Sequence, residues 1–422
     1  MESNAPKVFC DQLPVELVFD ILLRLPIQSL LTLMCVSKAW KSLISSPEFI
    51  KNYRKTSSNA CDTAQRKLIF SISCPPVYDC LTECSLYSVL YSPTAEATNM
   101  ITDPIFASSV TEATNIQHPA QKSIEIVGSC NGLVCIAIRE TRGWTFFNST
   151  DDMCLFLWNP SIRKYRRLPH WGFDFEEYSG VVTYGFGYDG LHDDYKVFTL
   201  LSNNLRKNLR RKVVGIYSQR TASWKMDEDF QKHLPLDNWS LQDTRGGHFV
   251  NGKLYWAAIS NGYGDDRPAN KIVSFDLVDE TYGDIQLPEN HMEKVSFWGW
   301  NIGVLGEGCL GLLWLHDDLK HLEVDIWILT ECGIRQSWTK MFLIRYPEDP
   351  GRGFRFDIRF QPVFLLNGSE LLLKLGSRLV LYNPEDGSYK DLDINYNFPD
   401  VEGDLRVDMY DESLVLLDGH DG

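Results

Sequence analysis

Several features that would define a protein class are missing from this 422-residue sequence. No stretch approaches the roughly 18 apolar residues of a bilayer-spanning helix, and residues 1–11 hold no apolar core of a signal peptide. Basic residues are outnumbered, with 41 Lys and Arg against 56 Asp and Glu and a formal net charge of −15. Because binding to a phosphate backbone needs clustered Lys and Arg, this balance argues against a nucleic-acid partner. We therefore predict a chain without membrane or nucleic-acid contacts, located in the cytoplasm, the nucleus or both.

Signatures of catalysis and of metal binding are also missing. The sequence has no Gly-x-Ser-x-Gly, no His-Glu-x-x-His, no P-loop and no dinucleotide-binding glycine motif. Its eleven cysteines form no Cys-x-x-Cys pair of the kind found in zinc sites, and their scattered positions favour reduced thiols. Carboxylate pairs such as Asp151 and Asp152 lie beside turn residues and are typical of solvated turns. We expect a non-catalytic protein without cofactor or structural metal.

The residues from 12 to 52 show the 3.6-residue period of helices. Large apolar residues recur at Leu17, Ile21 and Leu25 before a proline ends the first helix, and a similar face follows around Trp40. The pattern predicts three short helices. A unit of this size cannot bury so many large side chains alone. It is therefore either a helical cap on the rest of the chain or a module that binds helices of another protein.

A polar stretch, residues 53–65, separates this helical region from the rest of the chain. It is rich in Ser, Thr and Asn, and it predicts a linker or the fraying end of a late helix. Beyond it the apolar period changes to two, which indicates strands.

The strand-rich region contains a repeat that is visible in its turns. Asn-Gly and Asp-Gly pairs accept the positive φ angles that two-residue hairpin turns require. Five turn glycines follow one another at intervals of 56 to 62 residues, at Gly132, Gly190, Gly252, Gly308 and Gly368. This spacing predicts a structural unit of nearly 60 residues.

Aromatic residues form a second series with a similar period. Its members are Trp158, Tyr217, Phe275, Trp327 and Tyr382. In four of the five copies another aromatic residue follows seven positions later, and in the copy that contains Trp327 it follows after a longer turn. These second aromatic residues are Tyr165, Trp224, Tyr282, Trp338 and Tyr389. A repeat of this length, with four short strands in each unit, is typical of the blades of a β-propeller.

Five repeats occupy residues 124–394, and strand-like segments remain at both ends. They are residues 68–73, 86–91, 405–410 and 413–417. We predict that they form a sixth blade, which closes the ring and hides its open edges. Six blades are favoured, with five or seven as alternatives and a pair of β-sandwiches as the competing architecture. The polar residues 94–121 are predicted to form a long surface loop.

The N-terminal helices resemble an F-box, the motif that docks onto the Skp-type adaptor of a cullin–RING ubiquitin ligase. The resemblance rests on two Leu-Pro pairs and on the segment Val36-Ser37-Lys38-x-Trp40 that follows them. It implies helix-in-groove contacts made by apolar side chains. The implied adaptor-binding residues are Leu13, Pro14, Leu17, Ile21, Leu22, Leu25, Pro26, Leu30, Val36 and Trp40.

The strand-rich region resembles the kelch-like F-box-associated domain of plant F-box proteins. The resemblance rests on IVGSCNGLVCIAI from Ile126, LWNPSIRKYRRLP from Leu157, YGFGYDGLHDDYKV from Tyr184 and LVLYNPEDG from Leu379. That group includes defence regulators and the pollen receptors of self-incompatibility. The two resemblances divide the chain into an F-box (residues 9–52), a linker (53–65) and a propeller (66–422).

The combined resemblance implies a substrate-recognition subunit of an SCF-type ubiquitin ligase. The propeller would hold an unknown target protein, and the adaptor would connect the chain to a cullin and a RING subunit. Two alternatives stay open: a propeller scaffold whose F-box recruits the adaptor without ubiquitination, and a carbohydrate-active propeller with an incidental helical cap.

Candidate target contacts lie on connections between strands, because loops over a rigid scaffold commonly carry binding groups. The basic run at residues 206–212 is unusual in an acidic protein. It is typical of a solvated hairpin loop, and the alternatives are a nuclear-import signal or a contact for an acidic or phosphorylated partner. Four connections are predicted to hold the target: residues 171–179, 205–212, 261–268 and 298–301. The predicted target-binding residues are Trp171, Arg206, Arg210, Arg211, Tyr263, Trp298 and Trp300.

Overall fold

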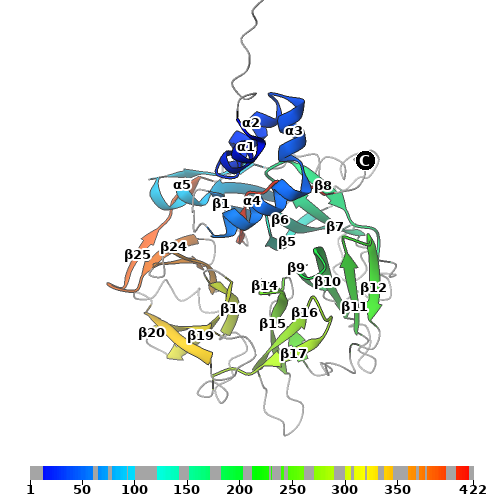
Figure 1. The fold of residues 1–422 in the computed structure, drawn as a ribbon. Helices are drawn as coiled ribbons and strands as arrows, with labels where there is room; N and C mark the ends of the chain where they lie inside the picture. Colours follow the sequence, from blue (N-terminus) through cyan, green and yellow to red (C-terminus); the bar gives the residue numbers. More distant parts are fainter. Residues whose placement is uncertain are drawn as a thin grey trace, which may run out of the picture.

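In the computed structural model, four helices precede a ring of β-sheets (Figure 1). The structure describes residues 13–59, 65–74, 78–92, 94–99, 121–141, 152–171, 182–202, 212–227, 230, 239–241, 246–260, 270–288, 300–305, 308–318, 321–330, 337–345, 360–366, 370–375, 378–395 and 405–417.

The N-terminal helices α1 to α4 pack into one unit, which we call the helical unit. Proline stands immediately before the first two helices, where its fixed φ suits a helix start. The hydroxyls of Ser37 and Ser46 accept backbone N–H groups at the starts of the next two. The helices are α1 (Val15–Leu22), α2 (Ile27–Met34), α3 (Lys38–Ile44) and α4 (Pro47–Asn59). The three predicted helices are confirmed, and α4 continues through residues 53–59, which the sequence left open between linker and helix.

The helical unit has an apolar core of its own. It consists of the buried side chains Leu22, Ile27, Leu30, Ile44, Phe49 and Tyr53. One residue from the far end of the chain, Leu414, completes this core. The first and last described segments of the chain therefore pack against each other.

Five blades repeat along the chain, each with one inner strand nearest the ring axis, and we number them one to five. Blade one has β5 (Gln121–Cys130), β6 (Leu133–Thr141), β7 (Asp152–Asn159) and β8 (Lys164–Arg167). Blade two has β9 (Val182–Asp189), β10 (Asp194–Ser202), β11 (Lys212–Ser218) and β12 (Ser223–Asp227). Blade three has β13 (Trp239–Leu241), β14 (His248–Val250), β15 (Lys253–Ser260), β16 (Asn270–Asp276) and β17 (Tyr282–Ile285).

The remaining two repeats have the same order. Blade four has β18 (Trp300–Leu305), β19 (Cys309–Asp318), β20 (His321–Leu329) and β21 (Trp338–Arg345). Blade five has β22 (Phe360–Leu366), β23 (Glu370–Leu375), β24 (Arg378–Asn383) and β25 (Ser388–Asp391).

A sixth blade, the closing blade, is built from both ends of the strand-rich region. It contains β27 (Leu405–Asp411), β1 (Arg66–Cys74), β2 (Tyr78–Ser85) and the short β4 (Thr98–Asn99). Strands β1 and β27 pair antiparallel from Arg66 opposite Asp411 to Ile72 opposite Leu405. The inner strands β5, β9, β14, β18, β22 and β27 each contact the next around the ring. Six blades and closure by both chain ends are therefore confirmed.

Two of the predicted end strands are wrong. Residues 86–91 form helix α5 (Leu86–Tyr91), which buries Leu86, Val89 and Leu90 against the closing blade and blade five. This i, i+3, i+4 spacing suits a helix, and tertiary burial outweighs the strand preference of the valine and tyrosines. Residues 413–417 follow β27 as an irregular segment outside any strand.

The predicted surface loop at residues 94–121 lies mostly outside the described residues. Its start forms β3 (Ala95–Glu96), which pairs in parallel with β26 (Ile394–Asn395), and β4, which pairs with β2.

The seven-residue aromatic spacing corresponds to the hairpin between the third and fourth strands of a blade. Directly opposed pairs are Trp158 with Tyr165, Tyr217 with Trp224, Phe275 with Tyr282, and Tyr382 with Tyr389. The fifth residue after the first aromatic has a φ of 52° to 71° in each turn, at Arg163, Ala222, Glu280 and Gly387. The conserved spacing within the chain therefore reflects one recurring turn geometry.

In blades two to five the second aromatic residue of the series also connects neighbouring blades. Trp224 Nε1 donates to the carbonyl of Pro169 at 2.7 Å, and Tyr282 Oη donates to the Asp227 carboxylate at 2.9 Å. Trp338 and Tyr389 make corresponding bonds to backbone carbonyls of the preceding blade, at 3.1 and 2.7 Å. These polar contacts lie beside apolar interfaces, so they set the angle between blades that burial alone would leave free.

The hairpin turns follow the sequence expectation at some positions. Asn131-Gly132 and Asn251-Gly252 have the predicted positive φ values. At Asp189-Gly190 the expectation is wrong, because the positive φ falls on Asp193. The Asp189 carboxylate instead caps a longer turn by accepting the N–H groups of the two residues after Gly190. Gly368 lies outside the described residues.

Glycine is required where blade three packs against β9. A Cβ added at Gly187 would lie 2.3 Å from the Phe249 ring, whereas the nearest atom to one at Gly190 is 3.9 Å away. We expect Gly187→Ala to destabilise the propeller by about 1–3 kcal/mol through overpacking, and Gly190→Ala to change stability by less than about 1 kcal/mol. Denaturant unfolding midpoints measure both. Equal midpoints for the two variants would contradict this packing argument.

Candidate partner-binding surfaces

The helical unit exposes large apolar side chains even though its core is complete. Leu13, Val15, Leu17, Ile21 and Val36 are each between 45% and 68% exposed. Leu17 and Ile21 lie one turn apart on α1, so they share one side of the helix. A cluster of exposed apolar residues on a folded domain is typical of a protein-binding surface.

The ten residues implied by the F-box resemblance divide into two groups. Six are exposed: Leu13, Pro14, Leu17, Ile21, Pro26 and Val36. Leu22 and Leu30 are buried in the core of the helical unit, and Leu25 and Trp40 are half-buried beside it. The second group can support the exposed surface but does not form it.

Sequence reasoning missed Val15, the first residue of α1. A signal was present, because six of the eight residues of this helix are apolar. The apolar side of such a helix is wider than one core can cover, so part of it is available to a partner.

The helical unit is seated on one face of the propeller. Arg54 of α4 donates to the Tyr188 hydroxyl at 2.9 Å, and its guanidinium lies 4.6 Å from the centre of the Tyr188 ring. Ile162, in the turn between β7 and β8, packs against the core of the helical unit. Tyr188 precedes the turn between β9 and β10. The seat is therefore the face that carries the hairpin turns after first and third strands.

Four predicted target-binding segments are attached to the opposite face. In an antiparallel blade the connections after the second and fourth strands leave from the other end of the sheet. The flanking strand ends of residues 171–179, 205–212, 261–268 and 298–301 all lie there. Arg206, Arg210, Arg211, Tyr263 and Trp298 themselves lie outside the described residues.

Trp300 lies in β18 and not in a connection as expected, whereas Trp171 lies in the connection after β8 but is buried. Trp300 is 3% exposed, begins β18 opposite Trp314 and packs between blades three and four. Trp171 is 6% exposed and packs edge-on against Trp224, with the ring centres 5.3 Å apart. Large aromatic side chains fill the wedge between neighbouring blades, which a count of strands along the sequence does not reveal.

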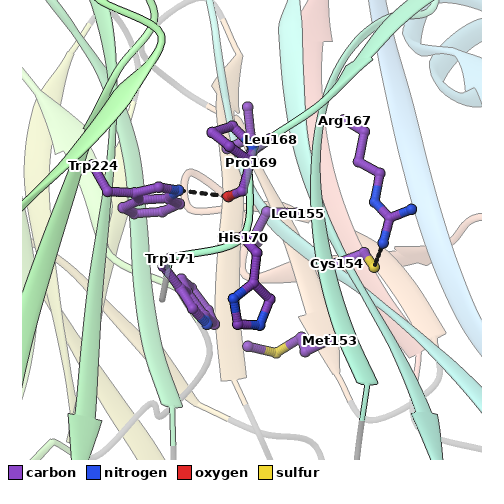
Figure 2. Close-up of a pocket in the computed structure, with 9 residues that line it drawn as sticks. All are labelled: Met153, Cys154, Leu155, Arg167, Leu168, Pro169, His170, Trp171 and Trp224. Atoms are coloured by element: carbon purple, nitrogen blue, oxygen red, sulfur yellow. Dashed lines mark hydrogen bonds between the residues drawn. The ribbon is translucent and has the colours of Figure 1, made fainter. Parts of the chain in front are cut away.

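A small hollow opens beside Trp171 between blades one and two (Figure 2). It encloses about 310 Å³, including space open to solvent, and is lined by Met153, Cys154, Leu155, Arg167, Leu168, Pro169, His170, Trp171 and Trp224. Arg167 donates to the Cys154 sulfur at 2.8 Å and points away from the two tryptophans. The lining combines the two tryptophans and aliphatic side chains with the polar groups of Arg167 and His170, so the hollow by itself indicates no particular ligand.

The described residues show little sign of reactive groups. Burial raises the pKa of the Cys84 thiol to about 11 and that of the Cys130 thiol further, so both stay protonated at neutral pH. No group of three or more His, Cys, Asp or Glu side chains in the described ranges is placed to hold a metal ion. Within the same ranges, no helix is long and apolar enough to span a bilayer.

Curated relatives match most of the chain. An F-box/kelch-repeat protein of Arabidopsis thaliana is 28% identical over 390 residues, which cover 92% of this chain and 93% of the relative. The F-box protein CPR1 of the same plant is 27% identical over 424 residues, covering 96% and 89%. The solved structures are more distant. A protein of unknown function from Dyadobacter fermentans is 11% identical with a TM-score of 0.38, covering 66% of this chain and 84% of its own. A similarity at that level supports no conclusion about activity.

Two family models account for nearly all of the sequence. The F-box domain model matches residues 10–52, which include the exposed apolar residues of the helical unit. The model of the F-box associated beta propeller domain matches residues 81–415, from the closing blade to the segment that follows β27. The chain therefore belongs to the F-box proteins that carry an F-box associated beta propeller domain.

Proposed function

We propose that this chain is the substrate-recognition subunit of an SCF-type ubiquitin ligase, acting in the cytoplasm, the nucleus or both. The observation that carries the proposal is the exposed apolar surface of the F-box. The helical unit has a closed core and a seat on the propeller, yet Leu17, Ile21 and Val36 remain at least half exposed. A helical cap alone would not need that surface, whereas grooves of a Skp-type adaptor would cover it.

The contribution of the chain to ubiquitination is geometric and requires no catalytic residue. The F-box binds the adaptor, and the adaptor connects it to the cullin and the RING subunit. The propeller binds the target. Holding two reactants together raises their effective concentration, so the transfer chemistry can reside entirely in other subunits.

The face of the propeller opposite the F-box is the proposed target-binding face. Connections after second and fourth strands leave from it, and the basic run at residues 206–212 follows β10 in the sequence, whose last residues lie at this face. In a chain with a net charge of −15, a local basic segment favours an acidic or phosphorylated partner. The proposed contact residues are Arg206, Arg210, Arg211, Tyr263 and Trp298.

Adaptor binding is tested with a charge on the exposed surface of α1. We expect Leu17→Asp to weaken binding of a Skp-type adaptor by about 2 kcal/mol or more, roughly thirtyfold, because the carboxylate would be buried against apolar groups. The matched control is Leu191→Asp on the propeller, where the leucine is 73% exposed. Titration calorimetry measures both variants, and unchanged unfolding midpoints establish that they are folded. Wild-type affinity of Leu17→Asp would refute the proposed docking surface.

Target binding is tested with charge reversal at three arginines. We expect Arg206→Glu/Arg210→Glu/Arg211→Glu to keep full adaptor affinity and to lose most of the recovery of bound target proteins. Targets are defined as proteins that co-purify with the wild-type chain and become more abundant when the proteasome is inhibited. Quantitative mass spectrometry of both purifications measures the loss.

Two results would count against the target-binding proposal. Unchanged recovery of targets by the charge-reversed chain would remove this loop from the proposed face. Partners whose abundance does not respond to proteasome inhibition would favour the scaffold alternative over a ligase subunit.

A further inference from the structure

The residues that follow β27 run between the F-box and the propeller, and we call residues 412–417 the C-terminal strap. At its start the N–H of Glu412 donates to the carbonyl of Gln65 at 3.0 Å, next to the ladder of β1 and β27. The strap is therefore continuous with the strand that closes the ring.

Neighbouring side chains of the strap enter different cores. Leu414 is 5% exposed and belongs to the core of the F-box, whereas Val415 belongs to the core between blades one and two. The Glu412 carboxylate accepts from Gln28 Nε2 of α2 at 3.1 Å and pairs with Lys67 Nζ of β1 at 3.2 Å. Burial would lower the pKa of Lys67, but Glu412 and Glu83 raise it, so the ammonium stays charged.

Side chains of blade one bind both carbonyl and N–H groups of the strap backbone. Asn159 is fully buried, and its Nδ2 donates to the carbonyls of Ser413 at 3.0 Å and Val415 at 2.9 Å. The N–H of Ser413 donates to the Ser161 hydroxyl at 3.1 Å. A Cβ added at Gly132 would lie 2.2 Å from Ser413 Cβ, so this glycine is required by close approach as well as by its φ of 78°.

We propose that the C-terminal strap couples closure of the propeller ring to the orientation of the F-box. Every contact of the strap requires β27 to be in place, and its contacts with Gln28 and the F-box core fix α2 relative to blade one. When the strap is in place, F-box and propeller behave as one rigid body; when the strap is released, the F-box keeps the contact of α4 with Tyr188 but loses the contacts that hold α2. A rigid body would also fix the distance between a bound adaptor and a bound target, and that consequence rests on the proposed function. The coupling itself does not rest on it.

A pair of matched asparagines provides the test. Asn159 and Asn383 occupy the same position of the recurring turn, and each Oδ1 accepts the N–H two residues later, at 2.9 Å. Asn159→Asp keeps this acceptor but replaces the amide donor with an oxygen that faces the strap carbonyls. Asn383→Asp makes the same change in blade five, away from the strap bonds of Asn159 and Ser161.

Hydrogen exchange of the full-length chain, followed by mass spectrometry, reports both ends of the coupling. We expect Asn159→Asp to speed exchange by about tenfold or more in the strap and in α1 to α4, because a buried hydrogen-bond network is lost. Exchange in β15 to β21 should stay unchanged, and Asn383→Asp should leave every segment unchanged. Leu414→Ala, which empties the F-box core at the same contact, should produce the same pattern and serves if Asn159→Asp does not fold.

Two results would overturn the coupling. Faster exchange in the strap with unchanged exchange in α1 to α4 would show that the F-box is held in place without the strap. Faster exchange in all blades together would show that Asn159 supports only general stability. Neither result depends on adaptor binding, so failure of the Leu17→Asp experiment and failure of the coupling are distinguishable.

Discussion

The antiparallel ladder between β1 and β27 is the contact on which the rest of the structure depends. A blade is a small sheet with two apolar faces, and it is stable only when neighbours cover both. Each of the six inner strands contacts the next, so an open ring would leave two blades half covered and two strand edges unpaired. The pairing of the first strand with the last removes both problems at once.

Between the blades, packing and polar contacts have different roles. The buried clusters, such as the one around Phe198, Trp256 and Phe275, supply the apolar area, which is not directional. Hydrogen bonds from Trp224, Tyr282 and their counterparts to the preceding blade are directional, so they define how the sheets are rotated relative to one another. Together these contacts produce a rigid support whose connecting segments are free to differ in length and composition.

Much of this architecture could be predicted because it is encoded in the intervals between turn glycines and between aromatic residues. The interval from Trp158 to Tyr165 is set by a hairpin, and it returns in blades two, three and five. Spacing does not encode what a side chain meets across a blade boundary. The sequence therefore placed Trp300 in a connection, although it is buried between blades. Residues 86–91 form a helix because the sheets that bury Leu86, Val89 and Leu90 are distant in the sequence.

The candidate binding surface illustrates the same limit within one helix. The F-box resemblance named Leu17, Ile21 and Leu22 together, but only tertiary packing separates the buried Leu22 from its exposed neighbours. For the target-binding residues the sequence could name chemical types and segments. That their flanking strands end on one common face follows from the antiparallel order of the blades, which a linear pattern does not contain.

The position of Leu414 in the core of the F-box has a consequence for synthesis on the ribosome. The helices of the F-box are translated first, but the residue that completes their core is translated after the strands of all six blades. During translation the nascent F-box therefore keeps an unfilled apolar site, and the ring behind it stays open. Only a chain translated through residue 417 has a filled F-box core and a closed ring, so a prematurely terminated chain would expose apolar surface to the cell's chaperones and proteases.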